Sequence, residues 1–244
     1  MEMTPTPPEQ PIQKRLVTVR NMFLPLVIIF AGLIVAVAVY VVRIREHVAN
    51  GSGTPQAVRA VSPSDHIIGN PSAPIVLVEY SDIDSEFGKK LQLTMEQLMT
   101  QYVAGNKVAW VYRHFPVTTL HPNASTHALA AECAQSVSTP AMFFRFIDAL
   151  NMRAPGAISF DPKQYGAVVA ELSLPKDSFE KCVKNATFEQ RVHDDYSNAL
   201  AAGATGSPYI ILLVQGQKPR QIQGAPPYKA LKKILDDEIA KLPQ

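Results

Sequence analysis

Residues 76–91 read Val-Leu-Val-Glu-Tyr-Ser-Asp-Ile-Asp-Ser-Glu-Phe-Gly-Lys-Lys-Leu, and this stretch decides the fold. Its first residues are β-prone, residues 81–85 are rich in types that cap helices, and helical character begins at Lys89. The pattern predicts a strand, a turn and a helix in immediate succession.

The segments that follow predict an α/β domain. A helix is expected over 89–102 and a second strand over 108–116, so the two strands should lie parallel with a right-handed crossover. The remaining expected elements are helices over 127–137, 141–150, 162–172, 176–185 and 187–203, strands over 209–213 and 220–223, and an amphipathic helix over 228–242.

Composition limits the classes of function. The chain has 244 residues, is 47% hydrophobic and carries a net charge of +2, with acidic and basic residues interspersed. One folded domain with appendages fits this length. No basic patch supports nucleic-acid binding, so no nucleic-acid partner is predicted.

An uncharged apolar run over 22–42 is long enough to cross a bilayer. A cleaved secretory signal is the alternative, but Tyr-Val-Val-Arg at 40–43 does not resemble a cleavage site. We therefore expect a transmembrane helix at 22–42, a disordered cytoplasmic tail at 1–21 and a flexible linker at 43–61. The flanking positive charges are nearly balanced and do not decide the orientation.

Residues 81–89 resemble the Ser-Asp-Phe-Glu-Cys-Pro-Phe-Cys-Lys motif of bacterial DsbA-like thiol:disulfide oxidoreductases. Three further stretches resemble this family in the same order, at 65–74, 114–124 and 203–211. The resemblance implies a thioredoxin fold over 62–244 with a helical insertion at about 120–200. It also implies a membrane-anchored protein whose domain lies outside the cytoplasm.

The same alignment implies that the two cysteines that exchange disulfides in this family are missing from the site. Ser85 and Gly88 stand where the family has its two catalytic cysteines, and neither residue can exchange a disulfide. Ser85 is read as a helix N-cap rather than a nucleophile, and Gly88 as clearing space over a groove. The resemblance makes Pro208 a cis-proline whose neighbour Ser207 can pair with an extended chain. The predicted substrate groove comprises Glu86, Phe87, Ser207 and Pro208.

The two cysteines, Cys133 and Cys182, fall in the predicted insertion. Similar cysteines form a second, structural disulfide in some DsbA-like proteins. Buried free thiols and a working redox couple are the alternatives, although no neighbouring residue favours a reactive thiolate.

His114 and His121 are interpreted as packing or surface histidines because no third ligand follows at metal spacing. No metal and no cofactor are predicted.

These observations favour a redox-inactive, membrane-anchored module that binds extended polypeptide or a partner protein, in a chaperone-like role. One alternative is a thiol:disulfide oxidoreductase working through Cys133 and Cys182. Another is a scaffold subunit of a membrane complex.

Overall fold

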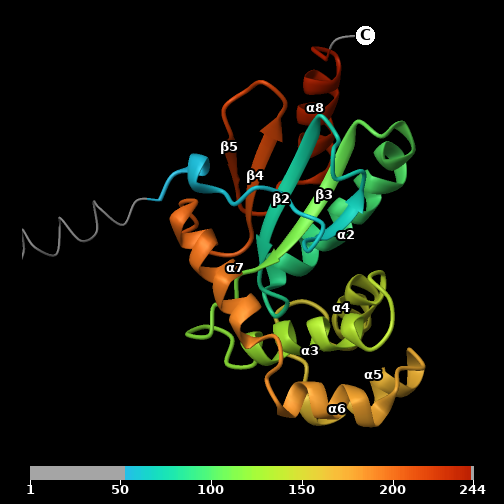
Figure 1. Ribbon diagram of the computed structural model, residues 1–244. Coiled ribbons are helices and arrows are strands. Elements are labelled where there is room, and N and C mark those ends of the chain that lie inside the picture. Colours follow the sequence, from blue (N-terminus) through green and yellow to red (C-terminus); the bar gives the residue numbers. More distant parts are fainter. Residues whose placement is uncertain (1–52, 243–244) are drawn as a thin grey trace, which may run out of the picture. The chain divides into compact units, whose positions relative to one another are not determined.

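The computed structural model describes residues 53–242. Five strands form one sheet in the order β1-β3-β2-β4-β5 (Figure 1). β2 and β3 are parallel and the other neighbours are antiparallel, as the predicted crossover requires. The strands are β1 (His66–Gly69), β2 (Ile75–Ser81), β3 (Val108–His114), β4 (Tyr209–Val214) and β5 (Arg220–Gln223).

The central strands are apolar on both sides because helices cover both faces of the sheet. Ile75 and Leu77 face a core shared with α2 (Glu86–Tyr102) and α8 (Tyr228–Ile239). Val76 and Val78 face the opposite core, which α7 (Glu189–Ala201) covers. Every residue of β2 and β3 is buried, which explains their nearly continuous hydrophobic sequences.

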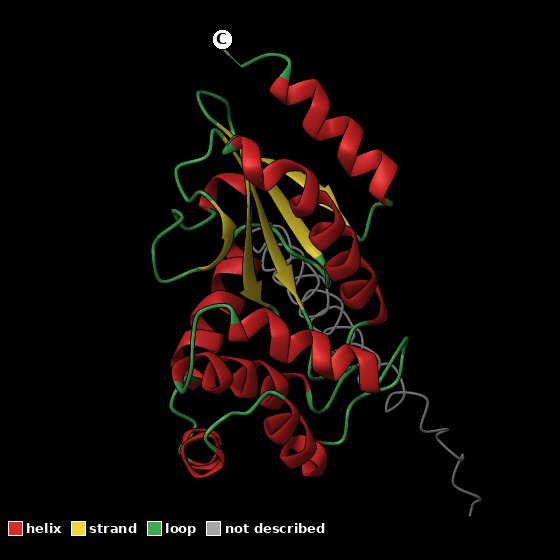
Figure 2. Ribbon diagram, turned by 90° about the vertical axis from the view of Figure 1, so that its right-hand side faces the viewer, coloured by secondary structure: helices red, strands yellow, loops and turns green. Residues whose placement is uncertain are grey.

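The helical insertion between β3 and β4 lies at one end of the sheet (Figure 2). Its helices are α3 (Ala124–Ser136), α4 (Met142–Arg153), α5 (Tyr165–Glu171), α6 (Lys176–Lys184) and α7. Phe143, Phe146 and Phe179 are fully or almost fully buried in it, so these aromatic side chains belong to the core. Short 3-10 helices occur at Pro55–Ala57, Val103–Gly105 and Pro162–Gln164.

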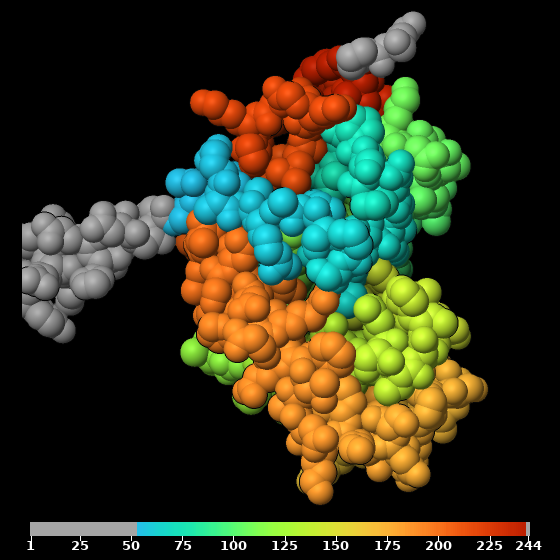
Figure 3. Space-filling view, in the orientation of Figure 1, coloured from blue at the N-terminus to red at the C-terminus, as the bar shows by residue number. Residues whose placement is uncertain are grey.

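Two segments differ from the sequence-based expectation. The turn-forming sequence of residues 62–74 predicts no strand, but His66–Gly69 pairs with β3 as an edge strand. The flexible linker was expected to extend to residue 61, yet residues 53–61 contact the domain. The Thr54 amide donates to the Ala201 carbonyl at 2.9 Å, and Arg59 forms an ion pair with Asp195 at 2.8 Å. Figure 3 shows this blue segment against the orange atoms of α7.

No helix within residues 53–242 is long and apolar enough to span a bilayer. The predicted tail at 1–21, the predicted transmembrane helix at 22–42 and residues 43–52 of the predicted linker lie outside the described residues.

Candidate functional site

The start of α2 forms one side of the candidate site. The helix begins at Glu86, three residues before the expected Lys89, and Ser85 is its N-cap. The Ser85 hydroxyl accepts a hydrogen bond from the Gly88 amide at 3.3 Å, so the predicted capping role is confirmed. Ser85 is only 4% exposed, which places its hydroxyl away from solvent and any substrate.

Gly88 is buried and packed tightly against the turn that precedes it. A Cβ atom built at this position would lie 2.6 Å from the Asp82 carbonyl oxygen and 2.8 Å from Ser81 Oγ. The expectation that Gly88 clears space over a groove is therefore wrong. The glycine allows backbone and hydroxyl oxygens to approach the helix closely, and any larger residue here requires the turn to move.

The loop before β4 forms the opposite side. The Ser207-Pro208 peptide bond is cis, as predicted. The Asp82 amide donates to Ser207 Oγ at 2.7 Å, which fixes the loop beside the turn. Thr205 and Gly206 are exposed, and the backbone of residues 205–207 makes no hydrogen bond to any described residue. These polar groups are available to an extended chain.

Apolar side chains extend the site along α2. Phe87 is 58% exposed on the same turn as the buried Ser85 and Gly88, and the Lys90 ammonium lies 5.4 Å from its ring centre. A groove of about 460 Å³ runs between α2 and α4. Its rim includes Leu93 and Met152, which are 67% and 81% exposed. The other lining residues are Glu86, Lys89, Lys90, Glu96, Asp148, Asn151, Pro155 and Gly156.

The two cysteines lie away from this turn, within the insertion. Cys133 on α3 and Cys182 on α6 form a disulfide with their Cα atoms 5.8 Å apart. The expected pairing is confirmed, and both cysteines are accounted for. Cys133 is fully buried, so an attacking thiolate has no direct path to its sulfur.

A family model described as thioredoxin matches residues 61–237. The chain belongs to the thioredoxin family. Its fold is DsbA-like, as solved structures show. Wolbachia pipientis alpha-DsbA1 superposes with a TM-score of 0.62 at 20% identity, covering 77% of this chain and 97% of that one. Oxidised BdbD from Bacillus subtilis gives 0.62 at 18% identity, covering 78% and 97%. BcfH from Salmonella enterica Typhimurium gives 0.63 at 13% identity, covering 89% and 93%.

The curated relatives are much longer proteins. Na(+)/H(+) antiporter NhaA 1 of Mycolicibacterium gilvum is 28% identical over 164 residues, which are 67% of this chain but 25% of that protein. The protein of the same name from Mycobacterium sp. strain KMS is 40% identical over 78 residues, 32% of this chain and 12% of that protein. The similarity is therefore confined to a small part of each relative.

A buried acid lies in this thioredoxin-family core, on β2 before the turn. Glu79 is 0% exposed, and the Trp110 indole nitrogen donates to its Oε2 at 2.9 Å. Its other carboxylate oxygen has no hydrogen-bond partner among the described residues. Burial raises the pKa of Glu79 to about 8, so the side chain is mostly protonated at neutral pH. Nothing in the local sequence marks this residue as buried.

The groove contains a second carboxyl group with a raised pKa. Burial and the neighbouring Glu96 raise the pKa of Asp148 to about 7. Because the two side chains come from α4 and α2, neither sequence spacing nor periodicity brings them together. Their proximity gives the groove a charge that changes near neutral pH.

The histidines have separate structural partners. Asp82 Oδ2 accepts from the Val117 amide at 2.8 Å and contacts His121 Nδ1 at 2.9 Å, so this aspartate fastens the loop after β3 to the turn. His114 instead lies beside His66 and Glu132. These partners come from distant segments, so no third ligand stands at metal spacing from His114 in the sequence.

Proposed function

We propose that this thioredoxin-family protein binds extended polypeptide without exchanging disulfides at its turn, as a membrane-anchored module outside the cytoplasm. The observation that carries the proposal is the contrast within one turn: Ser85 and Gly88 are buried, whereas Phe87 is 58% exposed. The turn presents an apolar surface where an exchange protein presents a thiol.

The chemistry of the turn argues against disulfide exchange there. Exchange requires a thiolate that attacks a disulfide sulfur and a second thiol that resolves the mixed disulfide. A hydroxyl group and a hydrogen atom occupy those positions. The Ser85 hydroxyl is also engaged as the cap of α2.

The geometry suits noncovalent binding of an extended chain. The unpaired backbone of residues 205–207 offers hydrogen bonds of the kind an added strand makes. Phe87 and Leu93 offer exposed apolar surface for the side chains of that strand. Backbone pairing gives affinity for many sequences, and the apolar surface favours segments that a folded protein buries.

The proposed location rests on two features. The uncharged run at 22–42 has the length of a membrane span. The Cys133–Cys182 disulfide fits an oxidising compartment, because reducing systems keep cytosolic thiols reduced. Thiol labelling of intact cells with a membrane-impermeant reagent, before and after reduction, tests this orientation, and carbonate extraction tests the anchor.

The binding test uses the full-length chain and a labelled, reduced and carboxymethylated polypeptide, which has no thiol to exchange. Fluorescence anisotropy should show saturable binding that weakens at least about tenfold in Phe87→Ala, as expected for an aromatic anchor. Val103→Ala is the control, because Val103 follows the opposite end of α2 and is 36% exposed. Equal weakening by both variants, or no binding at all, contradicts the proposal.

An insulin-reduction assay tests the other half of the proposal. The natural chain should be inactive, both with its disulfide intact and after reduction of Cys133–Cys182. Turnover that disappears in Cys133→Ala/Cys182→Ala would instead assign oxidoreductase chemistry to the insertion.

A second candidate is a subunit that associates with a membrane transporter. It is favoured by the curated relatives, which carry a segment similar to this chain within proteins named Na(+)/H(+) antiporters. Crosslinking in native membranes followed by purification should then recover an integral membrane transporter. Recovery of unfolded or newly secreted polypeptides would favour the first candidate.

A further inference from the structure

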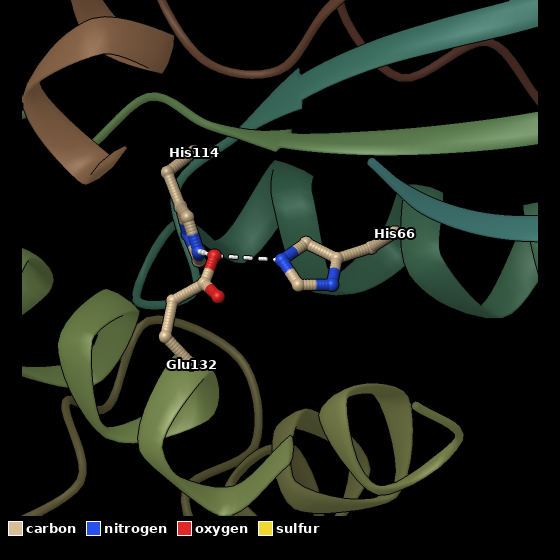
Figure 4. A group of neighbouring side chains, drawn as sticks. All are labelled: His66, His114 and Glu132. Atoms are coloured by element: carbon tan, nitrogen blue, oxygen red, sulfur yellow. Dashed lines mark hydrogen bonds and ion pairs between the residues drawn. The ribbon is translucent and has the colours of Figure 1, made fainter. Parts of the chain in front are cut away.

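Three metal-ligating side chains meet at the junction between the sheet and the insertion, outside the groove. Figure 4 shows His66 from β1, His114 from the end of β3 and Glu132 from α3 pointing toward one another. Glu132 Oε1 lies 2.6 Å from His66 Nε2 and 3.1 Å from His114 Nε2. All three side chains are at least nine-tenths buried.

The donor set matches the preference of one class of metal. Two imidazole nitrogens and one carboxylate oxygen form a ligand set that Zn²⁺ takes, at about 2.0–2.1 Å from each donor. Tetrahedral geometry then separates the ligand atoms by about 3.3 Å. The three ligand atoms here all lie within 4.8 Å of one another, so modest side-chain movement accommodates the ion.

The surroundings orient one imidazole for coordination. His66 Nδ1 lies 2.8 Å from Gln135 Oε1, a contact that places a proton on Nδ1 and leaves a lone pair on Nε2. Metal-binding histidines are held in this way by an acceptor behind the ring. No hydrogen bond from a described residue fixes the His114 ring at Nδ1, so His114 can also present an Nε2 lone pair.

The contacts around His66 Nε2 conflict when no metal is bound. Arg191 Nη2 lies 3.1 Å from this nitrogen, and a guanidinium can only donate. Glu132 Oε1, at 2.6 Å, can only accept while the carboxylate is ionised. A protonated Nε2 can donate to Glu132 but faces the Arg191 donor. An unprotonated Nε2 can accept from Arg191 but faces the lone pairs of Glu132. A cation between the imidazoles and the carboxylate removes the conflict.

Arg191 fills the remaining side of the cluster. Its Nε lies 2.5 Å from Glu132 Oε1 without an aligned hydrogen bond. The Arg191 side chain is 25% exposed, whereas that of Glu132 is 1% exposed. Arg191 Nη2 also donates to the Ser64 carbonyl oxygen at 2.5 Å. A long side chain that reaches solvent can turn outward once it gives up this hydrogen bond and its contacts with the cluster.

We propose that His66, His114 and Glu132 bind Zn²⁺ as a structural site, with Arg191 turning outward when the ion enters. The ion joins two strands of the sheet to α3. Glu132 precedes Cys133, whose disulfide ties α3 to α6. Metal and disulfide together would fix α3 on both sides.

The test uses the full-length chain without a histidine tag, stripped with a chelator and titrated with Zn²⁺ by calorimetry. We expect one ion per chain, and a thermal midpoint that rises with Zn²⁺ concentration because the ion binds only the folded state. Arg191→Met should bind at least about tenfold more tightly, a gain of about 1.4 kcal/mol, because the competing cation is gone. Glu132→Gln should lose the site.

His193→Ala is the control, because His193 on α7 has a 69% exposed side chain and should not affect binding. Co²⁺ added to the natural chain supplies a readout that needs no variant, namely strong visible absorption that Zn²⁺ abolishes. The proposal is overturned if the natural chain binds no Zn²⁺ and gives no Co²⁺ band. It is also overturned if folded Glu132→Gln, checked by circular dichroism, keeps full binding.

Discussion

The turn at 85–88 and the contact between α3 and α6 differ in what holds them together. The turn has the cap, the close approach at Gly88 and the facing cis-proline, but no sulfur. The helix contact has the disulfide, which joins the buried Cys133 to the partly buried Cys182. The geometry of a thioredoxin-type turn therefore rests on backbone packing and capping, whereas the covalent bond stabilises a region remote from it.

The strongest way to probe this contrast is to remove the disulfide. Cys133→Ala/Cys182→Ala should lower the free energy of unfolding by about 4 kcal/mol, because the bond closes a loop across a separation of 49 residues. Denaturant titration with and without dithiothreitol measures this loss. Reductant should destabilise the natural chain and leave the double variant unchanged. Polypeptide binding at Phe87 should survive at temperatures where the variant is folded.

The buried carboxyl group of Glu79, on the strand before the turn, predicts how the free energy of unfolding depends on pH. Its pKa is about 8 in the folded state and 4.5 ordinarily, so the unfolded chain releases a proton that the folded chain keeps. The contribution of this proton to the free energy of unfolding is fully present below pH 4.5 and is lost as pH rises through about 8. Between about pH 5 and 7, Glu79 should therefore lower the free energy of unfolding by about 3 kcal/mol.

Glu79→Gln should remove that slope, so its stability relative to the natural chain should increase with pH over this range. Chemical denaturation at several pH values measures the difference. Glu86→Gln at the exposed start of α2 is the control and should follow the natural chain. Parallel curves for the natural chain and Glu79→Gln would show that Glu79 is ionised in the fold.

The sequence predicted the elements that local patterns and the family resemblance specify. The strand β2, the cap at Ser85, the cis bond at Pro208 and the cysteine pairing were all confirmed. The strand and the cap depend on residues close in sequence, whereas the family resemblance implied the cis bond and the pairing of two cysteines that lie 49 positions apart. These features are therefore visible without knowing how distant segments pack.

The features that were missed come from distant segments that meet only in the fold. Four residues form β1, too few to show an alternating pattern, and the strand exists because β3 offers a free edge. Glu79 appears solvent-facing in the sequence because acids usually are, yet α2 covers its side of the sheet. His66 and Glu132 are 66 residues apart. Nothing in their local sequences indicates that contact.

Substitution of Gly88 tests how tightly the start of α2 packs against the turn that precedes it. Gly88→Ala should destabilise the chain by about 2 kcal/mol, because the new Cβ meets the Asp82 carbonyl and the backbone must shift. Gly166→Ala in α5 is a matched control with the opposite sign: its Cβ meets nothing within 4 Å, and alanine favours a helix by about 1 kcal/mol. If Gly88→Ala also stabilises, the turn is looser than its contacts indicate. The same clash predicts that Ser85→Cys/Gly88→Cys will need the turn to move before it can form a disulfide.

The prediction with the smallest effect tests whether a cap stabilises a helix through its hydrogen bond or through its residue type alone. Ser85→Ala should cost about 1 kcal/mol, because the Gly88 amide loses the hydroxyl that caps α2. Asn123 stands at the N-cap of α3 and is an equally good capping residue by type, but its side chain makes no cap hydrogen bond. Asn123→Ala should therefore cost clearly less than Ser85→Ala in the same denaturant titration. Equal losses would mean that residue type at the cap, acting through the unfolded chain, outweighs the hydrogen bond. A larger loss at Ser85 would mean that the turn keeps its serine for the helix that positions Phe87, with no catalytic role required to explain it.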